Sequence, residues 1–156
     1  MQRTSTCLWF DGQAKDAAEF YVGLFPNSRI TEVTTYLEGA PRPAGSVLTV
    51  RFTLDGTEYL ALDGGPEFRF TPAMSIVAYC DTQEEVDRLW GALGHRGQPG
   101  QCGWLTDRFG VSWQVVPRTL IGMVGAADRK AAQRAFTAMM EMMKLDIAAL
   151  RRAFAG

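Results

Sequence analysis

The sequence has one histidine, three cysteines and no long apolar run, and each of these shortages excludes a class of protein. It contains 16 Lys and Arg against 17 Asp and Glu, so it lacks the positive excess that is typical of nucleic-acid-binding domains. No apolar stretch approaches the roughly 18–20 residues of a membrane span, and the apolar run at residues 7–10 is shorter than a secretory signal requires. We therefore expect a soluble, cytoplasmic protein that binds neither nucleic acid nor a membrane.

The residues that could bind a metal or form disulfides are few and scattered. Cys7, Cys80 and Cys102 are odd in number and far apart, which argues against a disulfide framework, and none belongs to a C-x-x-C pair of the kind found in zinc sites. His95 lies in a loop just after a predicted helix and is expected to be a solvated surface residue. The sequence therefore predicts no metal and no other cofactor.

The first half of the chain predicts a strand, a helix and three further strands. Residues 6–10 form an apolar strand that stops at Asp-Gly, and small and aromatic residues then recur at helical spacing until Pro26. Residues 29–36 predict a strand, and residues 37–46 (LEGAPRPAGS) a Gly/Pro-rich loop. Residues 47–54 and 58–62 predict two strands joined at Asp55-Gly56, which is a strong hairpin signal.

The second half repeats this order. A strand at residues 75–80 is followed by a capping box from Thr82 to Glu85 and by a helix that ends near Gly94. Residues 102–106 and 111–116 predict strands on either side of a turn that contains Gly110. After residue 117 the composition changes to helix formers, with one helix over residues 131–144 and a last short helix capped by Asp146.

The two halves also align residue by residue. The alignment pairs Leu8 with Val77, Phe10 with Tyr79, Phe20-Tyr21 with Leu89-Trp90, Leu24 with Leu93, Thr6 with Ser75, Gly56 with Gly110, and Leu60 with Gln114. A long period that occurs only twice is not a solenoid. It predicts an α+β fold in which two βαβββ modules, at about residues 5–65 and 72–117, pair within residues 1–117 to form a cup-shaped mixed sheet. Residues 118–156 are expected to be a C-terminal helical extension of the same domain.

An apolar stripe marks the first of the C-terminal helices. It consists of Ala135, Phe136, Met139, Met140 and Met143. Methionine-rich surfaces can bind varied ligands, but stripes at helical spacing more often pack against other elements. We interpret this stripe as packing that braces a homodimer.

Several segments resemble a known family. The segments GQAKDAAEFYVGLFPNS, ALDGGPEF, GQCGWLTDRFGVSWQ and KLDIAAL are similar to the vicinal-oxygen-chelate (glyoxalase/bleomycin-resistance) superfamily, and within it to the PhnB-like branch, often labelled demethylubiquinone methyltransferase-like. The resemblance covers about residues 5–117. It implies two βαβββ modules paired into a cup, often across a dimer.

The resemblance also implies where a metal would bind. Metal-dependent members place His, Gln or Glu ligands on the first and last strand of each module, which corresponds here to Thr6, to Leu60 or a neighbour, to Met74 or Ser75, and to Gln114. Of these, only Gln114 is a conceivable ligand, whereas a stable first-row metal site needs three or four His, Cys or carboxylate ligands. The sequence therefore predicts a metal-free cup, although a one-residue change of register would turn a different set of side chains inward.

Strand periodicity gives a candidate ligand pocket. If Thr6 and Ser75 face the cup, so do Leu8, Phe10, Val77 and Tyr79, while Ser112, Gln114 and Val116 share a face and Trp113 points to the helix side. The candidate ligand-binding residues are Thr6, Leu8, Phe10, Ser75, Tyr79, Cys102, Trp104 and Gln114. Such an apolar, aromatic lining with a few polar points is typical of small-molecule pockets. The alternative is that these side chains simply fill the cup as core.

Other reactive residues have weaker claims. Cys102 could be an exposed nucleophile, but no base accompanies it, so a buried, inert thiol is the favoured interpretation. Asp63, Glu67 and Arg69 could contact a polar ligand and are interpreted as rim charges. Because Gly64-Gly65 is followed by Pro66, and no G-x-G-x-x-G is present, the cofactor loop that methyl transfer would suggest is missing.

Three functions remain open. The first is a metal-free protein that binds a small organic molecule in the aromatic cup, and it is favoured because no acid–base pair converges. The second is an enzyme that uses the same cup without a metal, with Gln114 orienting a carbonyl or a water molecule. The third is a metal-dependent lyase or dioxygenase of the glyoxalase type, with ligands recruited across a dimer.

Overall fold

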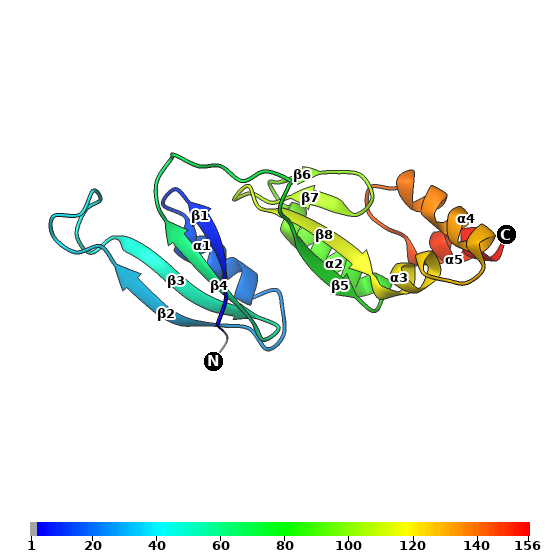
Figure 1. Ribbon diagram of the computed structural model, residues 1–156, viewed down its shortest axis with the longest axis horizontal. Coiled ribbons are helices and arrows are strands. Elements are labelled where there is room, and N and C mark those ends of the chain that lie inside the picture. The colour runs from blue at the N-terminus through cyan, green and yellow to red at the C-terminus, as the bar shows by residue number, and fades with distance from the viewer. Residues whose placement is uncertain (1–2) are drawn as a thin grey trace. The chain divides into compact units, whose positions relative to one another are not determined.

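The computed structural model describes residues 3–156, which fall into two compact units, one ending at Phe70 and the other beginning at Thr71. Each unit contains one βαβββ module, and the second unit continues into three helices (Figure 1). The predicted α+β fold with two βαβββ modules is therefore confirmed, and the strands form two four-stranded mixed sheets. No helix within residues 3–156 has the length and apolar character needed to cross a bilayer.

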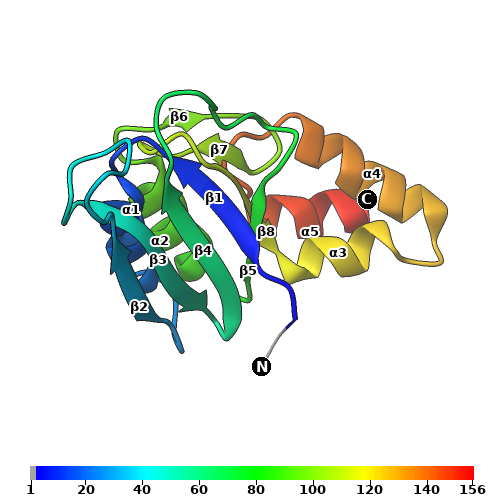
Figure 2. The same ribbon diagram turned by 60° about the vertical axis from the view of Figure 1, so that its left-hand side comes forward.

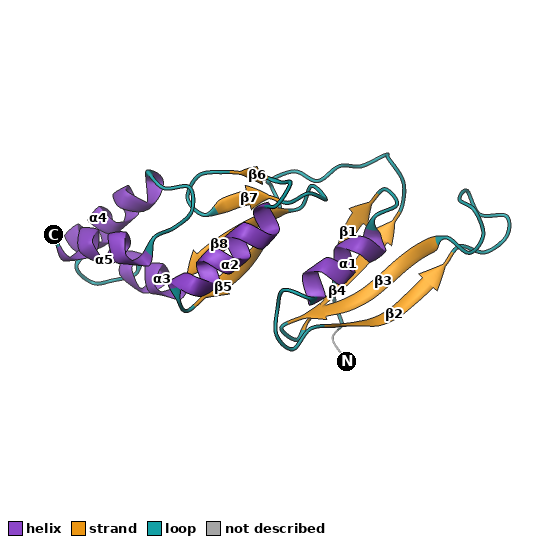
Figure 3. Ribbon diagram, turned by 180° about the vertical axis from the view of Figure 1, so that it is seen from behind, coloured by secondary structure: helices purple, strands orange, loops and turns teal. Residues whose placement is uncertain are grey.

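The first unit is a four-stranded sheet with one helix on it. Its elements are β1 (Thr6–Phe10), α1 (Ala14–Val22), β2 (Arg29–Thr35), β3 (Val47–Leu54) and β4 (Thr57–Asp63). The strand order is β1-β4-β3-β2, with β1 parallel to β4 and the other pairs antiparallel. Figure 3 shows α1 lying along one face of this sheet.

Small residues bring α1 close to its sheet. Ala14, Ala17 and Ala18 are fully buried, and the Tyr21 ring lies 6.4 Å from the Phe52 ring on β3. The first turn of α1 is held from β4, because the backbone N–H of Ala14 donates to the Asp63 carboxylate at 2.9 Å. The hydrophobic core of this unit therefore lies between α1 and one face of the sheet.

The second unit repeats this arrangement with shorter outer strands. Its module consists of β5 (Ile76–Cys80), α2 (Gln83–Gly94), β6 (Gln98–Pro99), β7 (Trp104–Thr106) and β8 (Ser112–Pro117). The order is β5-β8-β7-β6, and β5 is parallel to β8. Ala78, Cys80, Leu105, Trp113 and Val115 are buried on the helix side of this sheet.

Two local signals in the sequence act as predicted. Asp55 and Gly56 both have positive φ values, +45° and +78°, as a two-residue hairpin turn between β3 and β4 requires. The Thr82 hydroxyl accepts a hydrogen bond from the Glu85 backbone N–H at 3.2 Å, which caps α2. The Glu85 carboxylate reaches back to the N–H of Asp81, at 2.7 Å, and not to that of Thr82.

Three helices follow β8 (Figure 2). They form their own hydrophobic cluster. They are α3 (Arg118–Val124), which the sequence did not predict, α4 (Arg129–Met140) and α5 (Ile147–Ala155). The predicted helix over residues 131–144 ends earlier, at Met140, so Met143 lies beyond α4. The apolar stripe is divided: Ala135 and Met139 pack into the cluster, whereas Phe136, Met140 and Met143 are exposed. Two of the five stripe residues are thus explained by packing within the chain.

The α4–α5 connection is attached to the second module through its backbone. The Gln83 amide on α2 donates to the Leu145 carbonyl at 3.1 Å and accepts from the Ile147 N–H at 2.8 Å. The backbone N–H groups of Cys102 and Gly103 donate to the carbonyls of Met142 and Met143, at 2.7 and 2.8 Å. The helices therefore belong to the second unit.

Candidate functional site

The face of the second sheet opposite α2 gathers aromatic, aliphatic and amide side chains. Trp104 on β7 is paired with Gln114 on β8, which is paired with Val77 on β5. One step along, Val116 is paired with Tyr79. Since their neighbours in sequence are buried beneath α2, these five residues project to the other side of the sheet. We call this set, together with Ser75, the open face.

A hydrogen-bonded polar pair lies at one end of the open face. The Gln114 Nε2 donates to the Ser75 hydroxyl at 3.0 Å, which fixes the orientation of the amide. A primary amide and a hydroxyl together offer both donors and acceptors. Because the pair is only partly buried, it keeps hydrogen-bonding capacity for a ligand that lies on the sheet.

A cation lies at the other end. The Arg118 guanidinium is 4.8 Å from the centroid of the Tyr79 ring, within the range of a cation–π contact. Its Nε is 3.4 Å from the Asp81 carboxylate, and both charged side chains are well exposed. The open face is therefore an apolar strip between an amide–hydroxyl pair and a guanidinium.

Four of the predicted ligand-binding residues lie together on this face: Ser75, Tyr79, Trp104 and Gln114. Trp113 is buried on the helix side, as strand periodicity predicted. Their shared location follows from the structure, whereas their role in binding stays a prediction.

The prediction was wrong about the face of β1. Leu8 and Phe10 are each only 3% exposed, in the core beneath α1, and Thr6 has the same strand parity. Cys7 and Trp9 project from the opposite face instead. The alignment was shifted by one residue, because the strand ends Phe10 and Cys80 are 70 positions apart while the helix N-caps Gln13 and Thr82 are 69 apart.

Trp9 is the aromatic residue that sequence reasoning missed in the first unit. Its indole Nε1 donates to the Gly65 carbonyl at 2.8 Å, and Phe68 packs edge-on at 5.0 Å. A Cβ on Gly64 would lie 2.3 Å from the indole ring, so a glycine is required there. Aligning the repeats by strand ends and not by helices would have paired Trp9 with Tyr79 and revealed it.

Two side chains hold the loop at residues 37–46 of the first unit. The Arg42 guanidinium is 2.7 Å from the Asp11 carboxylate, and the Tyr36 hydroxyl donates to the Asp63 carbonyl at 2.7 Å. Asp63 itself is only 4% exposed, so its interpretation as a rim charge was wrong. Its carboxylate is used to hold α1, whereas Glu67 and Arg69 are exposed.

Cys102 lies outside the open face. The predicted strand at residues 102–106 begins only at Trp104, and Cys102 occupies a turn with a φ of +59°. Its thiol is half-buried and its Sγ is 3.6 Å from the Sδ of Met140. Cys102 therefore contacts the C-terminal helices. The sequence predicted a buried thiol and a residue that lines the cup, but Cys102 is neither fully buried nor on the open face.

Cys80 is the buried cysteine. Burial, followed by the nearby negative charge of Glu85, raises the pKa of its thiol to about 11. Burial also raises the pKa of the Cys7 thiol. Both thiols are therefore protonated at neutral pH, which makes them poor nucleophiles.

The residues at the positions where related proteins hold a metal do not fit one. With the register of β1 corrected, the positions are Cys7, Leu60, Met74 or Ser75, and Gln114, and none of these is a histidine or a carboxylate. Throughout residues 3–156, no three His, Cys, Asp or Glu side chains converge closely enough to share a metal ion.

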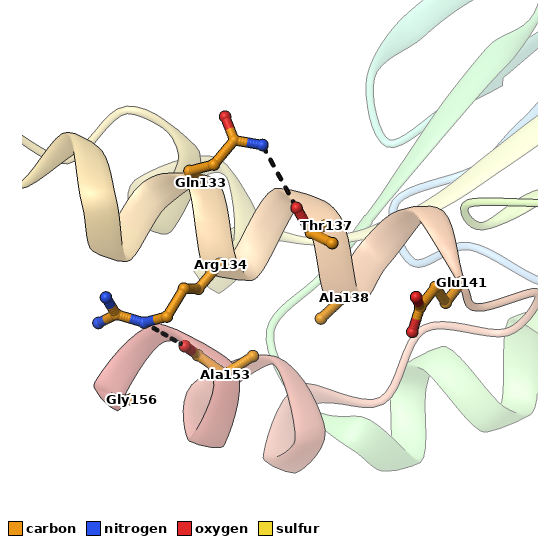
Figure 4. A pocket seen from close by; sticks show the side chains of 7 residues that line it. All are labelled: Gln133, Arg134, Thr137, Ala138, Glu141, Ala153 and Gly156. Atoms are coloured by element: carbon orange, nitrogen blue, oxygen red, sulfur yellow. Dashed lines mark hydrogen bonds between the residues drawn. The ribbon is translucent and has the colours of Figure 1, made fainter.

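Two surface hollows lie elsewhere in the second unit. Figure 4 shows the larger, about 420 Å³ in volume, between α4 and α5, where the Arg134 Nε donates to the Ala153 carbonyl at 3.0 Å. The smaller, of about 230 Å³, is lined by residues that include Trp90 and His95. Arg134, the cationic side chain of the larger hollow, is already engaged in holding the end of α5. We therefore place the candidate site on the open face and not in this hollow.

In each βαβββ module the helix covers one face of the sheet and leaves the other face uncovered. Two such modules define a protein of the glyoxalase-fold class. The family model for 3-demethylubiquinone-9 3-methyltransferase matches residues 2–116. This chain therefore belongs to that family, the PhnB-like branch of the vicinal-oxygen-chelate superfamily, as the sequence resemblance predicted.

Solved structures agree with this assignment. A PhnB protein from Bacillus cereus is 37% identical, with a TM-score of 0.69 over 74% of this chain and 99% of its own. Protein PA1353 from Pseudomonas aeruginosa is 22% identical, with a TM-score of 0.62 over 75% and 98%, and supports the fold alone. No curated protein matches the chain significantly.

Proposed function

We propose that this protein binds a small organic molecule with a planar, apolar body on the open face, without a metal. The observation that carries the proposal is the hydrogen-bonded Gln114–Ser75 pair beside Trp104, on a sheet face that α2 leaves uncovered. An apolar surface with few, well-oriented polar groups is the composition that small-molecule sites share.

The side chains divide the work of binding. Trp104, Val77 and Val116 supply the apolar surface on which a flat ring would lie, and the Trp104 indole adds stacking. Gln114 would orient the ligand, because its amide is already fixed by Ser75 and need not be ordered on binding.

Replacing Trp104 with alanine is expected to weaken binding of the neutral fluorescent probe N-phenyl-1-naphthylamine by about tenfold, through lost apolar contact and stacking. The measurement is a fluorescence titration of the purified protein. The matched control is Trp90→Ala, because Trp90 lies on α2 beside the smaller hollow. Equal weakening by both variants, or none by Trp104→Ala, would contradict the proposal.

We also expect that protein purified without chelator carries far less than about one equivalent of zinc, iron or manganese. The reason is the chemistry of the four strand positions, none of which carries a histidine or a carboxylate. Metal analysis by mass spectrometry provides the check. About one equivalent of bound metal would instead support the glyoxalase-type lyase or dioxygenase.

The family description names a methyltransferase, and we do not extend methyl transfer to this chain. The Gly64-Gly65-Pro66 segment follows β4 but leads into no helix among the described residues, so it is not a strand–loop–helix cofactor cradle. The predicted homodimer stays a prediction, for which the exposed Phe136, Met140 and Met143 offer an apolar surface. The cytoplasmic location likewise stays a prediction.

A further inference from the structure

We infer that the ligand of the open face is a small organic anion whose carboxylate or sulfonate binds Arg118, with its ring body lying over Val116 toward Gln114. This inference rests on the proposed function and adds a charge and an orientation to it. The observation that carries it is the position of the Arg118 guanidinium over the Tyr79 ring.

Arg118 is held at the open face from two sides. It is the first residue of α3, directly after β8, and its guanidinium lies 4.8 Å from the Tyr79 ring centroid. Tyr79 is 49% exposed, so the pair is accessible from the sheet face. The ring contact holds the planar guanidinium in one place, which lowers the entropic cost of binding an anion there.

The ion pair with Asp81 leaves room for a second anion. It involves the Nε atom at 3.4 Å, and a guanidinium has two further nitrogens for a bidentate contact with a carboxylate or sulfonate. Asp81 is also well exposed and is therefore a weak partner. A ligand anion can share the guanidinium with Asp81 or displace it.

The spacing of the two polar ends limits the size of the ligand. Tyr79 is paired with Val116, which is two residues from Gln114 along β8. Two residues of a strand span about 7 Å. One ring or a fused pair of rings therefore fits between an anion at Arg118 and a hydrogen bond at Gln114.

The experiment compares two probes whose naphthalene is the fused pair of rings that this spacing fits, and which share the same additional phenyl group: neutral N-phenyl-1-naphthylamine and the anionic 1-anilinonaphthalene-8-sulfonate. Arg118→Gln is expected to weaken binding of the anionic probe about fivefold more than it weakens binding of the neutral probe. Asp81→Asn should have the opposite sign and tighten the anionic probe about twofold. Arg151→Gln, an exposed arginine on α5, is the control for net charge.

The outcomes separate the inference from the proposed function. If the neutral probe depends on Trp104 but Arg118→Gln does not change the ratio of the two affinities, the inference is overturned and the proposed function stands. If neither probe depends on Trp104, both are overturned. Probe affinity that falls as protein concentration rises would show that a second copy of the chain covers the face, which also overturns the inference.

Discussion

Replacement of Asp107 by alanine is expected to lower the free energy of unfolding of the second unit by about 4 kcal/mol, because three donors, two of them buried and one part-buried, lose their acceptor. The Asp107 carboxylate accepts from the backbone N–H groups of Phe109 and Val111, at 2.8 and 3.0 Å, and from the Trp113 indole at 2.8 Å. Only 3% of this residue is exposed, so water does not replace these bonds. Urea unfolding followed by circular dichroism measures the loss.

Asp107→Asn provides the matched control. Its amide oxygen can keep the two backbone hydrogen bonds, but its NH₂ group would face the Trp113 Nε1–H, donor against donor. We expect about half of the loss seen with alanine. A loss below about 1 kcal/mol for the alanine variant would contradict the assigned role, since it would equal the value of a single ordinary hydrogen bond.

Gly103→Ala is expected to destabilise the second unit by about 3 kcal/mol, and two separate costs add to this value. Gly103 has a φ of +83°, which costs a residue with a Cβ about 1 kcal/mol. The Cβ would also lie 2.8 Å from the Val115 carbonyl and 3.0 Å from the Leu145 side chain. The backbone would have to shift, which weakens the hydrogen bond of the Gly103 N–H to Met143.

Gly39→Ala separates the two costs. Gly39 has a φ of +81°, but a Cβ built there meets nothing within 4 Å. We expect it to cost only the conformational part, about 1 kcal/mol. Thermal unfolding of both variants makes the comparison, and equal losses would show that the contacts of Gly103 with β8 and Leu145 add nothing.

The sequence was sufficient to predict both modules, because their signals are local. Hydrophobic periodicity, the Asp55-Gly56 turn and the Thr82 cap each act within a few residues, and the structure contains all three. The register of β1 failed for an equally local reason. The connection between β1 and α1 is one residue longer than the connection between β5 and α2, and it contains Gly12, with a φ of +80°. An alignment based on the helices therefore places the wrong face of β1 outward.

Long-range contacts determine what the sequence did not predict. From the sequence, Asp63 was interpreted as a charge at the rim of the cup. It is buried instead, because its carboxylate accepts a hydrogen bond from the N-terminus of α1, which lies 49 residues earlier in the chain. Cys102 leaves the strand pattern because its backbone bonds to Met142. The side chains that project away from the helix were predicted correctly in the second unit, where the pattern of β5 and β8 is regular. On β1 of the first unit the wrong face was predicted.

The attachment of residues 142–147 has a consequence for how freely this segment can vary. Four hydrogen bonds between this segment and the module use its main-chain atoms, at Met142, Met143, Leu145 and Ile147. The Lys144 ammonium adds one side-chain contact, 2.6 Å from the Asp87 carboxylate on α2. Main-chain groups are the same for every residue except proline. On the module side the junction therefore depends on Gln83 and on the Cys102-Gly103 turn, and within the segment the side chains that matter most are Lys144 and the buried Leu145, whereas exposed Met143 is free to vary.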